Sequence, residues 1–228
     1  MPDVGEAIGQ ILPLAVGVAV SPVPIIAVIL MLVTPRARMN GPAFVLGWLG
    51  GLAAVGVIVL AIASPADAND DGEPATWVSV LKLALGLLLV VVALREWRGR
   101  PRGGEQAATP KWMGAIDAFT PPKAGGAGAV LSGANPKNLL LAVAAAAAIA
   151  QTGISGGEQA VAYAVFAVIA TIGVAAPVLI YFALGDRARP ILDDLKAWMG
   201  RNNAVIMAVL CLVIGAKLVG DAISGFST

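Results

Sequence analysis

One short polar stretch, residues 132–139, interrupts an otherwise apolar run from 125 to 150. It places Lys137 between Pro136 and Asn138. A charged side chain near the middle of a membrane span is costly, so it marks a functional site by default. A proline there breaks the helical hydrogen-bond ladder and frees backbone groups that can face a ligand. The stretch therefore predicts a binding site at a helix break.

A second stretch near the N-terminus has the same pattern. Residues 20–26 align with residues 134–140, since each begins with a small residue and a polar residue, followed by proline and an apolar run. Broken helices at corresponding positions in two halves of a chain are the best sequence sign of a transporter binding site, and half-helix N-termini favour anions. The predicted substrate-binding residues are Lys137, Asn135, Asn138, Pro136, Ser21, Pro22 and Pro24.

Each of these residues also has a structural explanation. Lys137 lies about 18 Å into its predicted span, and no Asp or Glu lies deep in any span. It could be neutral, be solvated by carbonyls freed at Pro136, or await an anionic substrate, and we favour the anion over a proton relay. Asn135 and Asn138 could cap freed amides. The serine and prolines of the first stretch could simply bond within and kink their helix.

Composition identifies the class of protein. The chain has 228 residues, of which 58% are hydrophobic and 13% charged, and its mean hydropathy is +0.86. Soluble domains are about one quarter charged, and continuous apolar runs in a membrane form helices. We predict an all-α polytopic membrane protein with six transmembrane helices, each of about 20 residues or more. The spans are predicted at 8–33, 41–64, 76–95, 125–151, 158–183 and 202–224, with 186–201 as a loop.

Basic residues predict the orientation of these spans. Twelve of the fifteen Lys and Arg residues fall in the first, third and fifth loops, and none falls in the tails or in the second and fourth loops. Cytoplasmic loops carry the excess of Lys and Arg, so both termini should lie outside. The other three basic residues, Lys82, Lys137 and Lys217, lie within spans. We expect Lys82 and Lys217 to be structural, with Lys217 paired to Asp221.

Two halves of three helices each are predicted, and an odd number per half inverts the second copy across the membrane. Residues 1–97 form the first repeat, 98–124 a basic cytoplasmic linker, and 125–228 the second repeat. Within the linker, 111–119 could form an amphipathic segment with Trp112 and Phe119 toward lipid. A Gly-x-x-x-Gly spacing ends at Gly51 and permits close helix contact, either within the chain or across a homodimer.

Several chemistries are disfavoured by composition. The chain has no His and a single Cys, Cys211, which removes His and Cys metal clusters and His-based acid–base catalysis. We expect no enzyme activity, no cofactor and no metal. A net charge of +1 gives no indication of a nucleic-acid partner. The acidic first residues, up to Glu6, lack the basic region of a secretory signal, so we expect the first helix to be retained.

The motif around Lys137 resembles that of a known superfamily. The chain is similar to the lysine-exporter (LysE) superfamily, whose six-helix members carry an Asn-Pro-Lys motif at the start of the fourth span. The sequence from Asn135 to Leu139, followed by an Ala-rich helix, most resembles the actinobacterial glycolipid-addressing proteins of the peptidoglycolipid- and sulfolipid-addressing type.

This resemblance implies a multi-pass plasma-membrane protein that helps to move a cell-envelope glycolipid outward. It also implies work beside a large lipid transporter of the resistance–nodulation–division type. Two other functions remain open: export of a small soluble solute such as an amino acid, and a scaffold that transports nothing. A groove open to lipid would favour the glycolipid, whereas a closed central cavity would favour the soluble solute.

Overall fold

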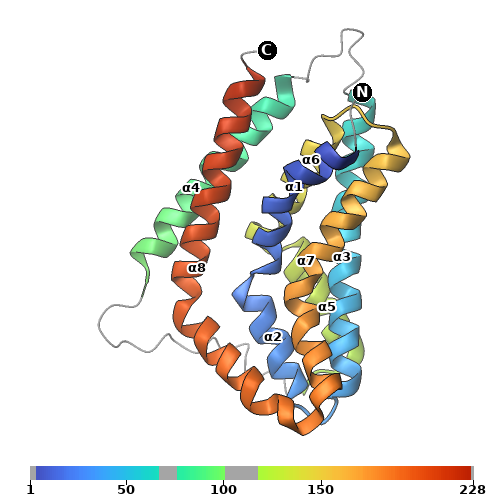
Figure 1. The fold of residues 1–228 in the computed structure, drawn as a ribbon, viewed down its shortest axis with the longest axis vertical. Helices are drawn as coiled ribbons and strands as arrows, with labels where there is room; N and C mark the ends of the chain where they lie inside the picture. The colour runs from blue at the N-terminus through green and yellow to red at the C-terminus, as the bar shows by residue number, and fades with distance from the viewer. Residues whose placement is uncertain (1–3, 67–75, 101–117, 227–228) are drawn as a thin grey trace.

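The computed structural model describes residues 4–66, 76–100 and 118–226, and these residues are helical apart from short connections (Figure 1). Among them there is no β-strand, so the all-helical part of the predicted fold class is confirmed. The helices are α1 (Val4–Ala19), α2 (Pro22–Leu32), α3 (Ala37–Ala66), α4 (Thr76–Arg98), α5 (Pro121–Gly133), α6 (Pro136–Ala150), α7 (Gly156–Leu184), the 3₁₀ turn η2 (Gly185–Arg187) and α8 (Ala188–Gly225).

Two of the predicted spans are broken helices. The pair α1 and α2 is bent by 50°, and the pair α5 and α6 by 62°. Each second half begins with a proline, Pro22 or Pro136, at its first helical position. Proline has no N–H to continue a ladder but suits the start of a helix, so each break falls directly before a proline.

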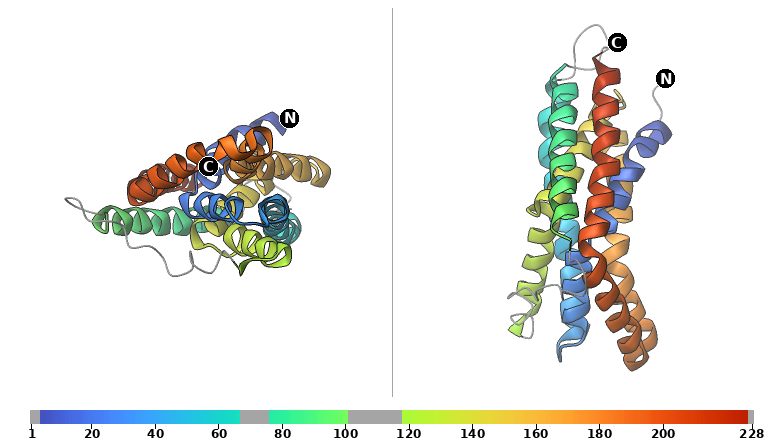
Figure 2. Two further views of the ribbon diagram at one scale, coloured as in Figure 1. Left: turned by 90° about the horizontal axis from the view of Figure 1, so that it is seen from below. Right: turned by 90° about the vertical axis from the view of Figure 1, so that its left-hand side faces the viewer.

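The helices are long and apolar enough for a membrane protein. Two continuous stretches, Ala37–Ile62 and Gly156–Gly225, each reach a hydropathy of 2.4 and could cross a bilayer. The number rises to four when each bent pair counts as one span. The second stretch contains α7 and α8, which run in opposite directions on either side of η2 (Figures 1 and 2).

The predicted loop at 186–201 is wrong, because α8 begins at Ala188 and continues for 38 residues. Pro190 lies in the first turn of α8, where it leaves no helical hydrogen bond unmade. Further along, Leu192 and Met199 are seven residues apart and both buried, as the apolar stripe of an amphipathic helix requires. Charge in this segment therefore belongs to the exposed face of a helix and does not mark a loop.

Both ends of the described chain lie at one end of the bundle (Figure 1). The α2–α3 and α7–α8 connections and the start of α5, all of which carry basic residues, lie at the opposite end. The predicted amphipathic segment falls outside the described residues except at its end. There, Phe119 is half-buried and packs against the core.

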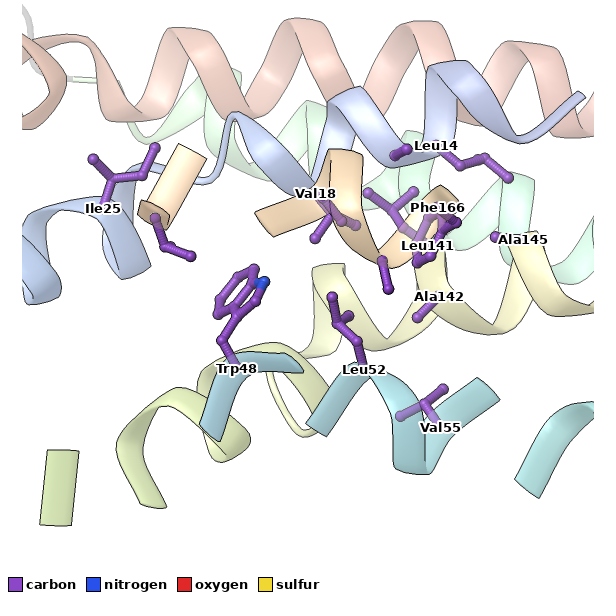
Figure 3. Close-up of a cluster of buried hydrophobic side chains, with 14 of the residues drawn as sticks. Leu14, Val18, Ile25, Trp48, Leu52, Val55, Leu141, Ala142, Ala145 and Phe166 are labelled. Carbon is purple, nitrogen blue, oxygen red and sulfur yellow. The ribbon is translucent and has the colours of Figure 1, made fainter. Parts of the chain in front are cut away.

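Small residues bring the helices close together. A Cβ at Gly47 would overlap the carbonyl of Gly125, and one at Gly51 would overlap the side chain of Ser132. The Gly-x-x-x-Gly spacing therefore packs α3 against α5 within the chain. The Ala-rich middle of α6 is almost fully buried, and apolar side chains from α1, α3, α6 and α7 meet beside it (Figure 3).

The α3–α5 contact predicts a large effect of one added methyl group. Gly47→Ala should destabilise the protein by about 1–3 kcal/mol, because the methyl meets backbone that cannot rotate away. At roughly 2–4 °C per kcal/mol, the thermal midpoint in detergent should fall by several degrees. Gly50→Ala is the matched control, since a Cβ there meets nothing within 4 Å. Equal midpoints for the two variants would contradict the packing.

Candidate functional site

Lys137 lies where the two broken helices cross. It is 4% exposed, and its Nζ donates a hydrogen bond of 2.7 Å to the carbonyl oxygen of Gly17 in α1. This carbonyl is not one of those freed at Pro136, which we had considered as partners, but belongs to the other broken helix. Lys137 therefore ties the start of α6 to the end of α1.

The break in the first helix explains why the Gly17 carbonyl is available. In an unbroken helix this oxygen would accept from the amide of Ser21, four residues on. Helix α1 ends at Ala19, and Ser21 has an extended backbone with φ −90° and ψ 109°. The last carbonyls of a helix also carry partial negative charge, which favours a cation. The ammonium of Lys137 thus caps the C-terminus of α1.

Asn138 makes a second connection between the breaks. Its Oδ1 accepts a hydrogen bond of 2.7 Å from Oγ of Ser21, and its Nδ2 donates one of 2.9 Å to the carbonyl of Leu131 in α5. The Leu131 carbonyl is free because the Asn135 amide donates to Val130 instead. Asn138 therefore caps a freed carbonyl and not a freed amide as predicted.

The other predicted site residues lie at the same breaks but make fewer contacts. Asn135 is the N-cap of α6, yet its side chain makes no capping hydrogen bond, and Pro136 is exposed. Pro22 and Pro24 are buried in the first turn of α2. The structure thus places Lys137, Asn138 and Ser21 at the same breaks: Asn138 and Ser21 are bonded to each other, and Lys137 makes a separate bond to Gly17. The prolines determine where the helices break.

Among the described residues, no carboxylate pairs with the buried ammonium of Lys137. The ion pairs among the described residues are Lys196–Asp193 and Lys217–Asp221, both at 2.6 Å, and the second confirms a predicted pair. Lys82, expected to be structural, is buried at 8% exposure. Within the described ranges no three His, Cys, Asp or Glu side chains come together as metal ligands do.

Sequence reasoning missed one participant at the site and one unpaired donor in the core. Gly17 contributes only a backbone oxygen. The one sequence signal for it is that Ser21, whose amide would donate to this oxygen in an unbroken helix, lies four residues later and directly before Pro22. Trp48 of α3 is fully buried, and its Nε1 has no hydrogen-bond partner in the described part of the chain. Figure 3 shows its indole between Ile25 of α2 and Leu52 of α3.

An apolar groove lies directly beside the crossing. It has a volume of about 230 Å³ and lies between α2 and α5, and its wall includes Leu131, the residue whose carbonyl Asn138 caps. Its lining side chains are Val23, Ala27, Met31, Phe119, Ala127, Val130 and Leu131. The polar network and an apolar groove therefore adjoin at the break in α5 and α6.

The hydrogen bonds of Asn138 predict coupled effects on stability. Asn138→Ala should cost about 1–3 kcal/mol, because it leaves both the Ser21 hydroxyl and the Leu131 carbonyl without their partner. Ser21→Ala should cost less, and the double variant should cost less than the sum of the two. Denaturation in detergent measures each value, with Asn202→Ala as a control at an exposed asparagine. Strict additivity would contradict the network.

One of three comparisons with known proteins finds a match. No curated protein and no solved structure matches the chain. A family model described as Sap, sulfolipid-1-addressing protein, matches residues 11–224, which include both broken helices and almost every described residue. That family addresses a glycolipid in membranes and is not a known enzyme family. The chain therefore belongs to the sulfolipid-1-addressing protein (Sap) family, as the resemblance of its Asn-Pro-Lys-Asn-Leu motif implied.

Proposed function

We propose that this protein moves, or helps to move, a cell-envelope glycolipid outward across the plasma membrane by contacting its head group where the broken helices cross. The observation that carries the proposal is the burial of Lys137, whose ammonium is held by one backbone carbonyl of the opposite helix and pairs with no carboxylate in the described ranges. A charge kept at such a place has a functional role by default.

The electrostatics of the crossing favour an anionic head group. Lys137 is the second residue of α6, so its ammonium lies at the positive end of its own helix dipole. That placement is unfavourable for a cation and favourable for an anion, by about 0.3–1 kcal/mol or more. The ammonium has three N–H donors, of which the Gly17 carbonyl takes one. A sulfate, phosphate or carboxylate would match both the charge and the remaining donors.

The unpaired indole of Trp48 supports the same site. A buried N–H without an acceptor costs about 1–3 kcal/mol, so a protein rarely keeps one without a use. The Trp48 ring belongs to the apolar cluster that surrounds the breaks (Figure 3). When the helices part at their breaks, a head group could accept hydrogen bonds from both the Lys137 ammonium and the Trp48 indole.

The groove between α2 and α5 favours a lipid over a small soluble solute. Its lining is apolar and it adjoins the Asn138 network through Leu131. A lipid tail could stay in this groove or in the bilayer while only the head group crosses the polar network. A soluble amino acid would gain nothing from an apolar groove at the same place.

Close backbone contacts support two inverted repeats and six passes. Gly51, in the middle of α3, lies against the break after Gly133, and Gly173, in the middle of α7, lies against the break after Ala19. Each long helix thus packs on the broken helix of the other half. Helices α4 and α8 meet at Gly86 and Gly215, where each glycine faces the other's carbonyl. With the basic ends cytoplasmic, both termini would lie outside.

Replacement of Lys137 tests the proposal. In a strain that lacks the native gene, Lys137→Met should abolish surface delivery of the glycolipid, measured by lipidomics of surface and cell-bound fractions. Lys137→Arg keeps the charge and should keep part of the delivery. Protein level in the membrane is the control. Full delivery by Lys137→Met would rule out the head-group contact. A scaffold would be favoured if delivery were lost only when residues 98–115 are deleted, a segment that lies mostly outside the described residues.

Trp48→Phe separates function from folding. The variant loses the N–H but keeps an aromatic ring, and removal of an unpaired buried donor offsets the lost packing, so the thermal midpoint should change little. Delivery of the glycolipid should nevertheless fall several-fold. Phe44→Leu, a change at the ring that stacks on Trp48, is the packing control. Unchanged delivery by Trp48→Phe would remove the indole from the site.

A further inference from the structure

A second apolar groove lies away from the crossing, between α4 and α8. Its volume is about 400 Å³, larger than that of the groove beside Leu131. Helix α4 contributes Ala93, Leu94 and Trp97, and α8 contributes Ala208, Val209 and Leu212. Several of these side chains are about half exposed, so the groove opens on the outer face of the protein.

Three arginines lie near this groove. Arg98 follows Leu94 by four residues and Arg201 precedes Ala208 by seven, spacings at which residues lie on one face of a helix. Arg100 lies two residues past the end of α4. Because α4 and α8 run antiparallel and touch at Gly86 and Gly215, Arg98, twelve residues after Gly86, is level with the part of α8 near Arg201, fourteen residues before Gly215. We name Arg98, Arg100 and Arg201 the basic rim.

Arg100 connects the rim to the groove directly. Its guanidinium lies 3.8 Å from the ring centroid of Trp97, and its Nη1 donates 2.9 Å to the Trp97 carbonyl. A guanidinium has five N–H groups, so most of its donors remain for a ligand. Neither ion pair of the described chain includes a rim arginine. Glu96 lies nearby on α4, which leaves the three arginines and this one acid with a net charge of +2.

We infer that the groove between α4 and α8 is a second lipid site, which binds an anionic membrane lipid with its acyl chain along the groove and its head group on the basic rim. Within a bilayer the tail gains little from leaving other tails, so the head group must provide the selectivity. Basic pockets between membrane helices bind anionic head groups in this way. Trp and Arg that merely anchor a helix at the interface would not require a groove.

This site is separate from the head-group contact proposed at Lys137. None of its lining or rim residues belongs to the broken helices. A lipid here could hold the α4–α8 pair in the membrane or wait beside the transport site, but the binding itself depends on neither role. Lipid binding in this groove can therefore be tested independently of the proposed function.

Native mass spectrometry of the purified full-length protein tests the site. In detergent micelles that contain equal amounts of dioleoyl phosphatidylglycerol and dioleoyl phosphatidylcholine, we expect the anionic lipid to be retained preferentially. Arg98→Ala, Arg100→Ala and Arg201→Ala should each weaken its binding roughly fivefold. Arg187→Ala, in the η2 turn, and Arg189→Ala, in the first turn of α8, change exposed arginines; they are matched controls and should have no effect.

Two tryptophan variants test whether the acyl chain binds in the groove. Val209→Trp fills the groove from its lining, whereas Val213→Trp adds the same bulk at an exposed position of α8 outside the lining. Only the first should reduce binding of phosphatidylglycerol. The losses caused by the rim variants should be the same in a Lys137→Met background, which separates the two lipid sites. Equal retention of the two lipids, equal losses in rim and control arginines, or equal effects of the two tryptophans would each overturn the inference.

Discussion

A freed backbone carbonyl inside a membrane protein must find a partner within the protein, and this constraint organises the whole structure. Water is absent at that depth, and an unsatisfied peptide group there costs several kcal/mol. The chain breaks two helices and then satisfies the ends of both from one place, the first turn of α6. Lys137 caps α1 through Gly17, and Asn138 caps α5 through Leu131.

If the proposed head-group contact is correct, the same hydrogen bonds would let the site be stable without a ligand and respond to one. A lysine bound by a single carbonyl and an asparagine shared with Ser21 hold the breaks together when no ligand is present. An anion that replaced the Gly17 carbonyl would satisfy Lys137 at least as well, and it would release the end of α1. Binding and separation of the broken helices would then be one event, as a shift between two states requires.

Close packing stabilises the crossing of the broken helices. Gly51 and Gly173 allow α3 and α7 to contact the two breaks through backbone, and the alanines of α6 leave room for α1 beside them. Where side chains are this small, helix association depends on van der Waals contact more than on hydrophobic burial. A single methyl group on these surfaces therefore has a larger effect than its size suggests.

Sequence alone determined the helical class, the two breaks and the family, because apolar runs, prolines and the Asn-Pro-Lys-Asn-Leu motif are local features. It also singled out Lys137 and Asn138 as candidate site residues, since polar groups in an apolar run can be noticed without a structure. Tertiary structure decided their partners: the Gly17 carbonyl, the Ser21 hydroxyl and the intramolecular use of Gly51. The carbonyl partner could not be predicted because a backbone oxygen carries no residue-specific signal. The helical start of α8 could not be predicted because it depended on which face Leu192 could bury.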